Sequence, residues 1–451
     1  MISTVSIVDK STEIVGLVAD RLADPVAVAE VASHPDNWDP IYDALMWGPL
    51  TLSNGLPGVA LLYAELARSD QRWLAIAHRH IQAAGEAMTT QPSRGLHAGP
   101  AALLAATQTC GGQYPGLRRN LAAWVAADQL TRLEACRAHG DSGVSWETYD
   151  VINGLSGTAR LLLDAVEDPA ETGPDVERAL DGTLRHLVTV TRPIEADGHR
   201  VPGWWVPPQL QVSDRDRADY PRGDFNLGLA HGIPGPLMVL SLALRRGHDV
   251  PGLRDAIRRI AEWLMGWIRT DEHGTYWPCR VSFAEEIAET RPDGLFTRTA
   301  WCYGAPGVAS ALHHAGATLD VLSWRTAAVQ ALRDALSRDE NRWAISGPTI
   351  CHGYAGLLQV LHRVGSAEDD AELLDGRDRL ARKVLDHADP DAPFVFRHLM
   401  RYPRTAPGPT EFKALDVAGV LEGAAGVACA LLSVTDQPGE QRSWDRCLAL
   451  S

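Results

Sequence analysis

A short glycine-containing step recurs seven times along the chain, and this repeat constrains the fold more than any other feature of the sequence. In six copies, two glycines are separated by two residues and are followed by small and apolar side chains. These copies run from Gly55 to Gly58, Gly154 to Gly157, Gly232 to Gly235, Gly304 to Gly307, Gly353 to Gly356 and Gly423 to Gly426. A weaker copy runs from Leu96 to Gly99 and lacks the first glycine. Self-similarity of this kind indicates a repeat architecture.

The segments that follow the glycine steps have the apolar spacing of an α-helix. Apolar or small residues fall at positions i, i+3, i+4 and i+7, which line one helix face, in a register that begins at Val59, Val308, Leu357 and Val427. We therefore expect an all-α chain of seven helix pairs, which could stack as an open solenoid or close into a ring. The expected partner helices include the amphipathic stretches Leu253 to Arg269, Trp324 to Leu336 and Arg377 to His387.

Two of the glycine loops carry soft metal ligands at equivalent positions. Cys302 and Cys351 each lie five residues before the second glycine of their step, and His352 follows Cys351 directly. Two thiols and an imidazole suit zinc, and three protein ligands leave a fourth position open, as in catalytic zinc sites. Either cysteine alone could instead be a buried core residue. Their matching positions favour one zinc ion bound by all three side chains.

A shared zinc ion favours closure of the repeat into a ring. Cys302 and His352 are 50 residues apart, so one ion requires the loops of neighbouring repeats to converge. His231 lies four residues before the second glycine of its step, as His352 does. In an open stack, the loop of His231 would lie far from the other two loops. We expect an α/α toroid, a double-layered helical barrel whose glycine-rich loops converge on a central zinc site.

The composition fits one large globular enzyme. A length of 451 residues would suggest three domains at about 150 residues each, but the repeat continues from Gly55 to Gly426 without a linker. We therefore expect a single domain over residues 1–451. The net charge of −15 disfavours nucleic acids and anionic membranes as partners. The sequence contains neither an apolar run of about 18 residues nor a secretory pattern at its start, so we expect a cytoplasmic protein.

Several common catalytic motifs are missing from the sequence. The chain has no Gly-x-Gly-x-x-Gly fingerprint and no phosphate-binding loop, which argues against nucleotide-dependent chemistry. It also lacks His-Glu-x-x-His and Gly-x-Ser-x-Gly, the motifs of common metalloproteases and esterases. The Pro- and Trp-rich segment 193–222 has no helical period, so we expect an irregular or strand-bearing insertion there.

Further candidates for chemistry lie in or near the glycine loops. His231 would share the axis of the ring with His352, although a lone histidine is more often structural. Asp150 lies seven residues before Gly157, where it could instead cap a helix. Arg298 and Tyr303 flank Cys302, but they could equally be an ion-pair residue and a packing residue. The remaining candidate, at the same position as His352 in the last copy, is Glu422, whose role the sequence leaves open.

The motifs together resemble the lanthionine synthetase C-like family over nearly the whole chain. They are Tyr149-Asp150-Val151-Ile152-Asn153-Gly154, Ala230-His231-Gly232, Trp301-Cys302-Tyr303-Gly304 with Pro306-Gly307, Cys351-His352-Gly353 and Leu421-Glu422-Gly423-Ala424-Ala425-Gly426. The resemblance implies two layers of seven helices and zinc held by Cys302, Cys351 and His352. It also implies catalytic roles for His231, Asp150, Arg298 and Tyr303, and a cyclase without the dehydratase module of bifunctional relatives.

The implied reaction is the addition of a peptide cysteine thiol to dehydroalanine or dehydrobutyrine, which forms a lanthionine or methyllanthionine ring. Zinc would deprotonate the thiol, which otherwise has a pKa of about 8.5. Attack creates an enolate, for which Arg298 is the expected stabilising group and His231 the expected proton donor. The expected partners are a dehydrated precursor peptide rich in Ser, Thr and Cys, a separate dehydratase and an export transporter.

Other functions remain open at this stage. A zinc alcohol dehydrogenase uses similar ligands but needs a nicotinamide site, which this chain lacks. A relative within the same family could add glutathione to dehydrated residues. A scaffold that binds peptides and carries a structural zinc would need no catalytic residues, so the presence of His231, Asp150 and Arg298 argues against it.

Overall fold

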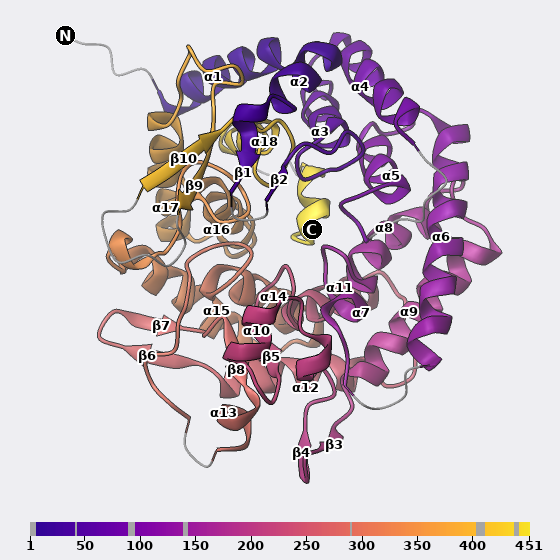
Figure 1. Cartoon of the computed structure of the whole chain (residues 1–451), viewed down its shortest axis with the longest axis vertical. Helices are drawn as coiled ribbons and strands as arrows, with labels where there is room; N and C mark the ends of the chain where they lie inside the picture. Colours follow the sequence, from indigo (N-terminus) through magenta and orange to yellow (C-terminus); the bar gives the residue numbers. More distant parts are fainter. Residues whose placement is uncertain are drawn as a thin grey trace. The chain divides into compact units, whose positions relative to one another are not determined.

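A computed structural model describes residues 6–40, 43–88, 95–138, 143–288, 291–402, 411–436 and 442–451. These residues are mainly helical, and the strands are short and pair two by two (Figure 1). The chain divides into two compact units, each assembled from separate stretches of sequence. The first unit contains Met1–Pro92, His97–Tyr114 and Ile345–Asp445, and the second contains Ser93–Leu96, Pro115–Ala344 and Arg446–Ser451.

The first unit is built from eight of the described helices and two strand pairs. Its helices are α1 (Ile7–Arg21), α2 (Pro25–Ala32), α3 (Leu56–Leu66), α4 (Leu74–Glu86), α5 (Pro100–Thr109), α16 (Tyr354–Glu368), α17 (Ala371–Asp386) and α18 (Ala424–Val434). Its antiparallel pairs are β1 (Trp38–Asp39) with β2 (Ala44–Leu45) and β9 (His398–Tyr402) with β10 (Glu411–Leu415).

The second unit contains ten of the described helices and three strand pairs. Its helices are α6 (Pro115–Ala138), α7 (Trp146–Tyr149), α8 (Leu155–Glu167), α9 (Pro174–Val190), α10 (Asp214–Asp219), α11 (Pro234–Arg245), α12 (Leu253–Gly266), α13 (Phe283–Ile287), α14 (Ala305–Leu319) and α15 (Leu322–Ser337). Its antiparallel pairs are β3 (Ile194–Ala196) with β4 (His199–Val201), β5 (Asp224–Asn226) with β8 (Arg280–Ser282) and β6 (Arg269–Asp271) with β7 (Gly274–Tyr276).

The helices that follow the glycine steps form the core of each unit. α3 and α18 are buried along their whole length, and α5, α8, α11, α14 and α16 are buried over most of theirs. Amphipathic helices pack against them, as α15 does against α14 and α17 against α16. The last core helix, α18, takes its partner from the start of the chain, because α1 packs against it. This pairing was not predicted from the sequence.

A close backbone approach requires the second glycine at four of the steps, namely at Gly58, Gly157, Gly307 and Gly426. The loop before the helix folds back over its first turn, so a Cβ atom at Gly157 would lie 1.9 Å from the Val151 carbonyl oxygen. A Cβ atom at Gly426 would meet the Val420 carbonyl oxygen at the same distance. Backbone atoms cannot move aside as a flexible side chain can. The repeat therefore reflects a turn of helix packed directly against its own preceding loop.

We expect Gly157→Ala to destabilise the protein by about 3 kcal/mol, because the added methyl group overpacks a site walled by backbone. Urea denaturation followed by circular dichroism measures this change. Gly85→Ala is the matched control, since no atom outside the helix's own turns lies within 4 Å of a Cβ atom at that position in α4. The control should be as stable as the wild type or more stable. Equal stability of both variants would contradict the account of the repeat.

Backbone hydrogen bonds join successive glycine loops. In the second unit, Leu96 N donates to Ile152 O, and Val151 N donates to Ala230 O, each at 3.1 Å. Ala230 N in turn donates to Cys302 O at 3.3 Å. The first unit continues the pattern: Leu52 N donates to His97 O, Val420 N to Leu52 O, and both Ile350 N and Cys351 N to Leu421 O. These bonds fix the loops to one another just before the positions that carry the candidate site residues.

The predicted position of the weakest copy of the repeat is wrong by three residues. Gly99, not Leu96, occupies the place of the first glycine, because it is the N-cap of α5 as Gly55 is the N-cap of α3. Gly99 has φ +70°, a conformation that favours glycine. The second glycine is replaced by Ala102, which is fully buried. One methyl group is thus tolerated at that position in this copy.

The predicted partner helices exist, with different ends. α12 begins at Leu253 as predicted but ends at Gly266, and Arg269 opens strand β6 instead. α17 begins at Ala371, six residues before the predicted Arg377, because the Asp370 side chain caps it by accepting hydrogen bonds from Glu372 N and Leu373 N. Segment 193–222 contains the β3–β4 hairpin and the short helix α10.

None of the helices in the described ranges is both long and apolar enough to cross a membrane.

Candidate metal and proton-transfer site

Cys302 lies in a tight turn directly before α14. Thr299 and Gly304 form an isolated antiparallel bridge, and Ala300 N donates to Tyr303 O at 3.2 Å. Gly304 has φ +89°, and a Cβ atom there would lie 1.5 Å from the Arg298 carbonyl oxygen, so the turn requires glycine. The Trp301 indole is buried and donates to the Leu448 carbonyl at 3.1 Å. The turn therefore holds Cys302, which is 4% exposed, in a fixed place.

Cys351 and His352 occupy the corresponding loop before α16. Cys351 N donates to Leu421 O at 2.9 Å, and His352 O accepts from Ser346 N at 3.1 Å, so backbone bonds on both residues hold the loop. The His352 ring meets the His398 ring edge-on, with centroids 5.5 Å apart. Burial, followed by the charge of His352, lowers the pKa of His398 to about 3, so this neighbour stays neutral.

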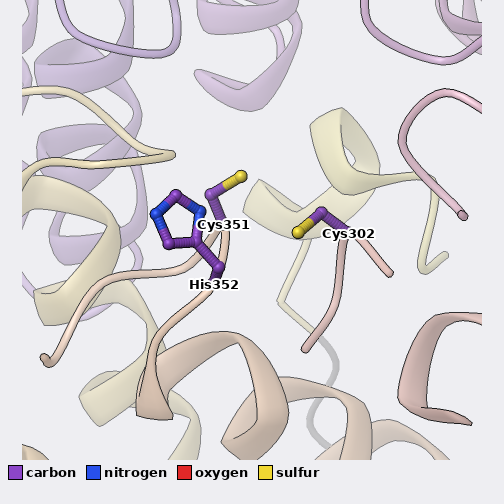
Figure 2. Close-up of side chains that lie close together, drawn as sticks. All are labelled: Cys302, Cys351 and His352. Atoms are coloured by element: carbon purple, nitrogen blue, oxygen red, sulfur yellow. The ribbon is translucent and has the colours of Figure 1, made fainter. Parts of the chain in front are cut away.

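The three predicted ligands lie together. One ligand atom from each of Cys302, Cys351 and His352 lies within 4.8 Å of the other two, and Figure 2 shows the side chains gathered at one place. Within the described part of the chain, no other three His, Cys, Asp or Glu side chains lie close enough together to hold a metal ion. The donor set fits zinc, which prefers thiolate and imidazole.

His231 and Asp150 form a second group. His231 Nδ1 lies 2.6 Å from Asp150 Oδ2, and a carboxylate can only accept, so Nδ1 carries the proton. The other carboxylate oxygen, Asp150 Oδ1, accepts from the backbone N–H groups of Asn153 at 2.7 Å and Gly154 at 2.5 Å. One oxygen of Asp150 thus holds the loop before α8, whose N-cap residue is Gly154, and the other contacts His231. The second imidazole nitrogen, Nε2, does not face Asp150.

The electrostatics of the pair favour a basic imidazole. Burial works to lower the pKa of His231, but the hydrogen bond and negative charge of Asp150, with a smaller contribution from Cys302, raise it above the ordinary value. The Asp150 side chain is 1% exposed and that of His231 is 29% exposed. The imidazole therefore keeps access to its surroundings while its partner carboxylate is shielded from water.

Tyr303 and Arg298 lie on either side of the Cys302 turn. The Tyr303 hydroxyl accepts a hydrogen bond from Asn226 Nδ2 at 3.0 Å, and burial raises the pKa of this phenol, so it stays protonated. Arg298 is half-buried four residues before Cys302. Burial raises the pKa of the nearby Cys279 thiol to about 12, and the charge of Arg298 acts in the opposite direction. Glu422 is half-buried in the loop before α18, and its role stays a prediction.

Trp146 and Arg280 also lie in this region, but neither was predicted from the sequence to be a site residue. The Trp146 ring stacks on the His231 ring, and the Arg280 guanidinium lies over the same indole. A signal for Trp146 was present, because it lies four residues before Asp150 and residues at this spacing share a helix face. No periodic pattern marks Arg280.

Comparisons with known proteins define the class. The model of the lanthionine synthetase C-like proteins matches residues 46–449, so the chain belongs to this family. The nisin biosynthesis protein NisC of Lactococcus lactis subsp. lactis is 26% identical over 325 residues, which cover 70% of this chain and 73% of NisC. The solved structure of nisin cyclase matches with a TM-score of 0.73 and 21% sequence identity. The match covers 98% of this chain and 96% of the nisin cyclase chain. The predicted helical toroid is confirmed by this match.

Proposed function

We propose that this protein is a zinc-dependent lanthipeptide cyclase. It would join cysteine thiols of a dehydrated precursor peptide to dehydroalanine or dehydrobutyrine residues of the same peptide, which forms lanthionine and methyllanthionine rings. The observation that carries the proposal is the cluster of Cys302, Cys351 and His352 in a chain of this family. The His231–Asp150 pair supports it with a group suited to proton transfer.

Cys302, Cys351 and His352 would hold the zinc ion. When bound there, zinc would lower the pKa of a substrate thiol in the fourth coordination position, so that the sulfur reacts as a thiolate near neutral pH. The two protein cysteines come from turns that backbone hydrogen bonds hold rigid.

His231 would move the proton. Its Nδ1 is committed to Asp150, which leaves Nε2 to take the proton that the thiol loses and to return a proton to the α-carbon. Asp150 would keep the ring in this tautomer and stabilise the imidazolium, because its carboxylate is buried and is itself held by two backbone N–H groups. The raised pKa of His231 favours the first of these two steps.

Arg298 and Tyr303 would act on the negative charge that develops during addition. When sulfur bonds to the β-carbon, the electron pair of the carbon–carbon double bond moves toward the neighbouring carbonyl oxygen. A guanidinium group stabilises such an enolate, and a phenol that stays protonated can donate a hydrogen bond to it. We assign the charge stabilisation to Arg298 and the hydrogen bond to Tyr303.

The reaction is balanced within the peptide. One S–H bond and one carbon–carbon π bond are lost, one C–S bond and one α-carbon–hydrogen bond form, and nothing is oxidised. The protein needs neither nucleotide nor reductant for this step. We propose that a dehydratase supplies the substrate, and that it and an export transporter act as separate proteins.

Dehydrated precursor incubated with this protein should lose free thiols while its mass stays the same, because the addition is an isomerisation. Alkylation with iodoacetamide followed by mass spectrometry counts the remaining thiols directly. A parallel sample with glutathione tests the alternative function. Peptides that gain the mass of glutathione, with no loss of their own thiols, would replace the cyclase with a glutathione-adding enzyme. A peptide that binds unchanged in both samples would favour a scaffold.

A further inference from the structure

Trp146 packs directly on the imidazole of His231. The two ring centroids are 5.5 Å apart and the ring planes differ by 22°, which is a stacked arrangement. Trp146 opens the single-turn helix α7, and Asp150 follows the last residue of that turn. One helical turn therefore presents both groups that contact His231. The carboxylate binds the imidazole edge and the indole covers the imidazole face.

The position of Trp146 is not set by a hydrogen bond of its own. Its Nε1 atom is buried and bonds to no acceptor within the described residues, although a buried indole N–H usually finds one. The indole instead has the Arg280 guanidinium over it, 5.0 Å from the ring centroid. Stacking contacts therefore hold this side chain in place.

Arg280 is itself immobilised. Its Nε donates to the buried Asp224 carboxylate at 2.5 Å, its Nη2 donates to Gln211 Oε1 at 2.7 Å, and its Nη1 pairs with Asp216. Arg280 opens β8, which is paired with β5, so its backbone is held as well. A guanidinium with three fixed partners gives the indole a rigid neighbour.

The stacking contact supplies a restraint that Asp150 cannot. A single hydrogen bond at Nδ1 fixes the edge of the imidazole but leaves the ring free to turn about the line between His231 and Asp150. A flat ring packed on the imidazole face removes this rotation. The direction of Nε2, which receives and returns the proton, is then determined. Misplacement by about 1 Å can slow a reaction by a hundredfold.

We propose that Trp146, supported by Arg280, is a positioning residue that holds His231 in the orientation needed for proton transfer. This inference rests on the proposed function of His231. It predicts that Trp146→Leu, which fills much of the space but lacks a flat ring, slows ring formation about 10- to 100-fold with little change in KM for the peptide. Trp146→Phe, which restores a flat ring, should recover most of the rate.

The test measures kcat and KM for ring formation in both variants, in Glu147→Ala and in the double variant Trp146→Leu/His231→Asn. Glu147→Ala is the matched control, because this exposed residue lies on the same turn and does not contact His231. It should behave as the wild type. In the His231→Asn background, Trp146→Leu should slow the reaction by less than about twofold, because the group it positions is gone.

Each outcome decides the question. Equal rate losses from Trp146→Leu in the presence and absence of His231 would mean a structural role and would overturn the inference. Equal activity of Trp146→Phe and Trp146→Leu at matched melting temperatures would overturn it too, because the flat ring would then not matter. If Trp146→Leu is normal while His231→Asn is slow, only this inference fails. A normal rate in His231→Asn would reject the proton-transfer role and this inference with it.

Discussion

His231→Asn is expected to bind zinc, to fold as the wild type does and to form rings at least about a hundredfold more slowly. The reason is that asparagine can neither take the thiol proton nor return one to the α-carbon, and a lost general acid or base costs about this much. The rate should be measured by thiol alkylation at matched zinc content over a range of pH. An imidazole accepts a proton only when neutral, so the wild-type rate should fall as the pH drops through the raised pKa of His231. That dependence should be absent in the variant.

Asp150→Asn provides the companion measurement. The amide can still fill the space, but it cannot stabilise the imidazolium, so we expect a smaller loss of rate than in His231→Asn. Near-normal ring formation by His231→Asn would discard the assignment of proton transfer. Loss of zinc from that variant would mean that His231 is a ligand or a support of the metal site.

The second large effect concerns the metal. The wild type should contain about one zinc ion per chain, and Cys302→Ala, Cys351→Ala and His352→Ala should each lose it, because two remaining protein ligands leave the shell underfilled. Plasma emission analysis of the purified proteins measures the content. Ring formation should fall with the zinc content in each variant.

Cys110→Ala is the matched control for the metal experiment. Cys110 is a buried thiol at the end of α5 and lies outside the ligand cluster, so this variant should keep its zinc. Full zinc occupancy in one of the three ligand variants would remove that residue from the site. Loss of zinc from the control as well would point to a general effect on folding.

The core helices could be predicted from the sequence because most of the complete glycine steps mark a close approach between a loop carbonyl and the first turn of a helix. The step from Leu96 to Gly99 was placed wrongly because Ala102 replaces the second glycine. Without a second glycine, only the positive φ of Gly99 shows where this copy of the step lies, and φ cannot be read from a sequence. The pairing of α1 with α18 was also missed, since it joins the two ends of the chain.

The ligand cluster could be predicted because Cys302 and Cys351 share a position within the repeat. The sequence also named His231 and Asp150 as separate candidates, and the structure shows the contact between them, with the two side chains 2.6 Å apart. The spacing of Trp146 from Asp150 was a signal in the sequence, but it does not reveal that the indole stacks on His231. The position of Arg280 over the same indole leaves no periodic trace, because the two segments are far apart in sequence. That the whole chain acts as a single domain stays a prediction.

The central claim is that this protein makes thioether rings, and detection of the product tests it most directly. A dehydrated precursor peptide should be incubated with the zinc-loaded protein, hydrolysed in acid and analysed for lanthionine and methyllanthionine, with the His231→Asn variant as the matched control. We predict one lanthionine or methyllanthionine for each thiol lost with the wild type, and about a hundredfold less in the same time with the variant. Hydrolysates of the wild-type reaction that contain neither amino acid, while the protein carries its full zinc, would contradict the account.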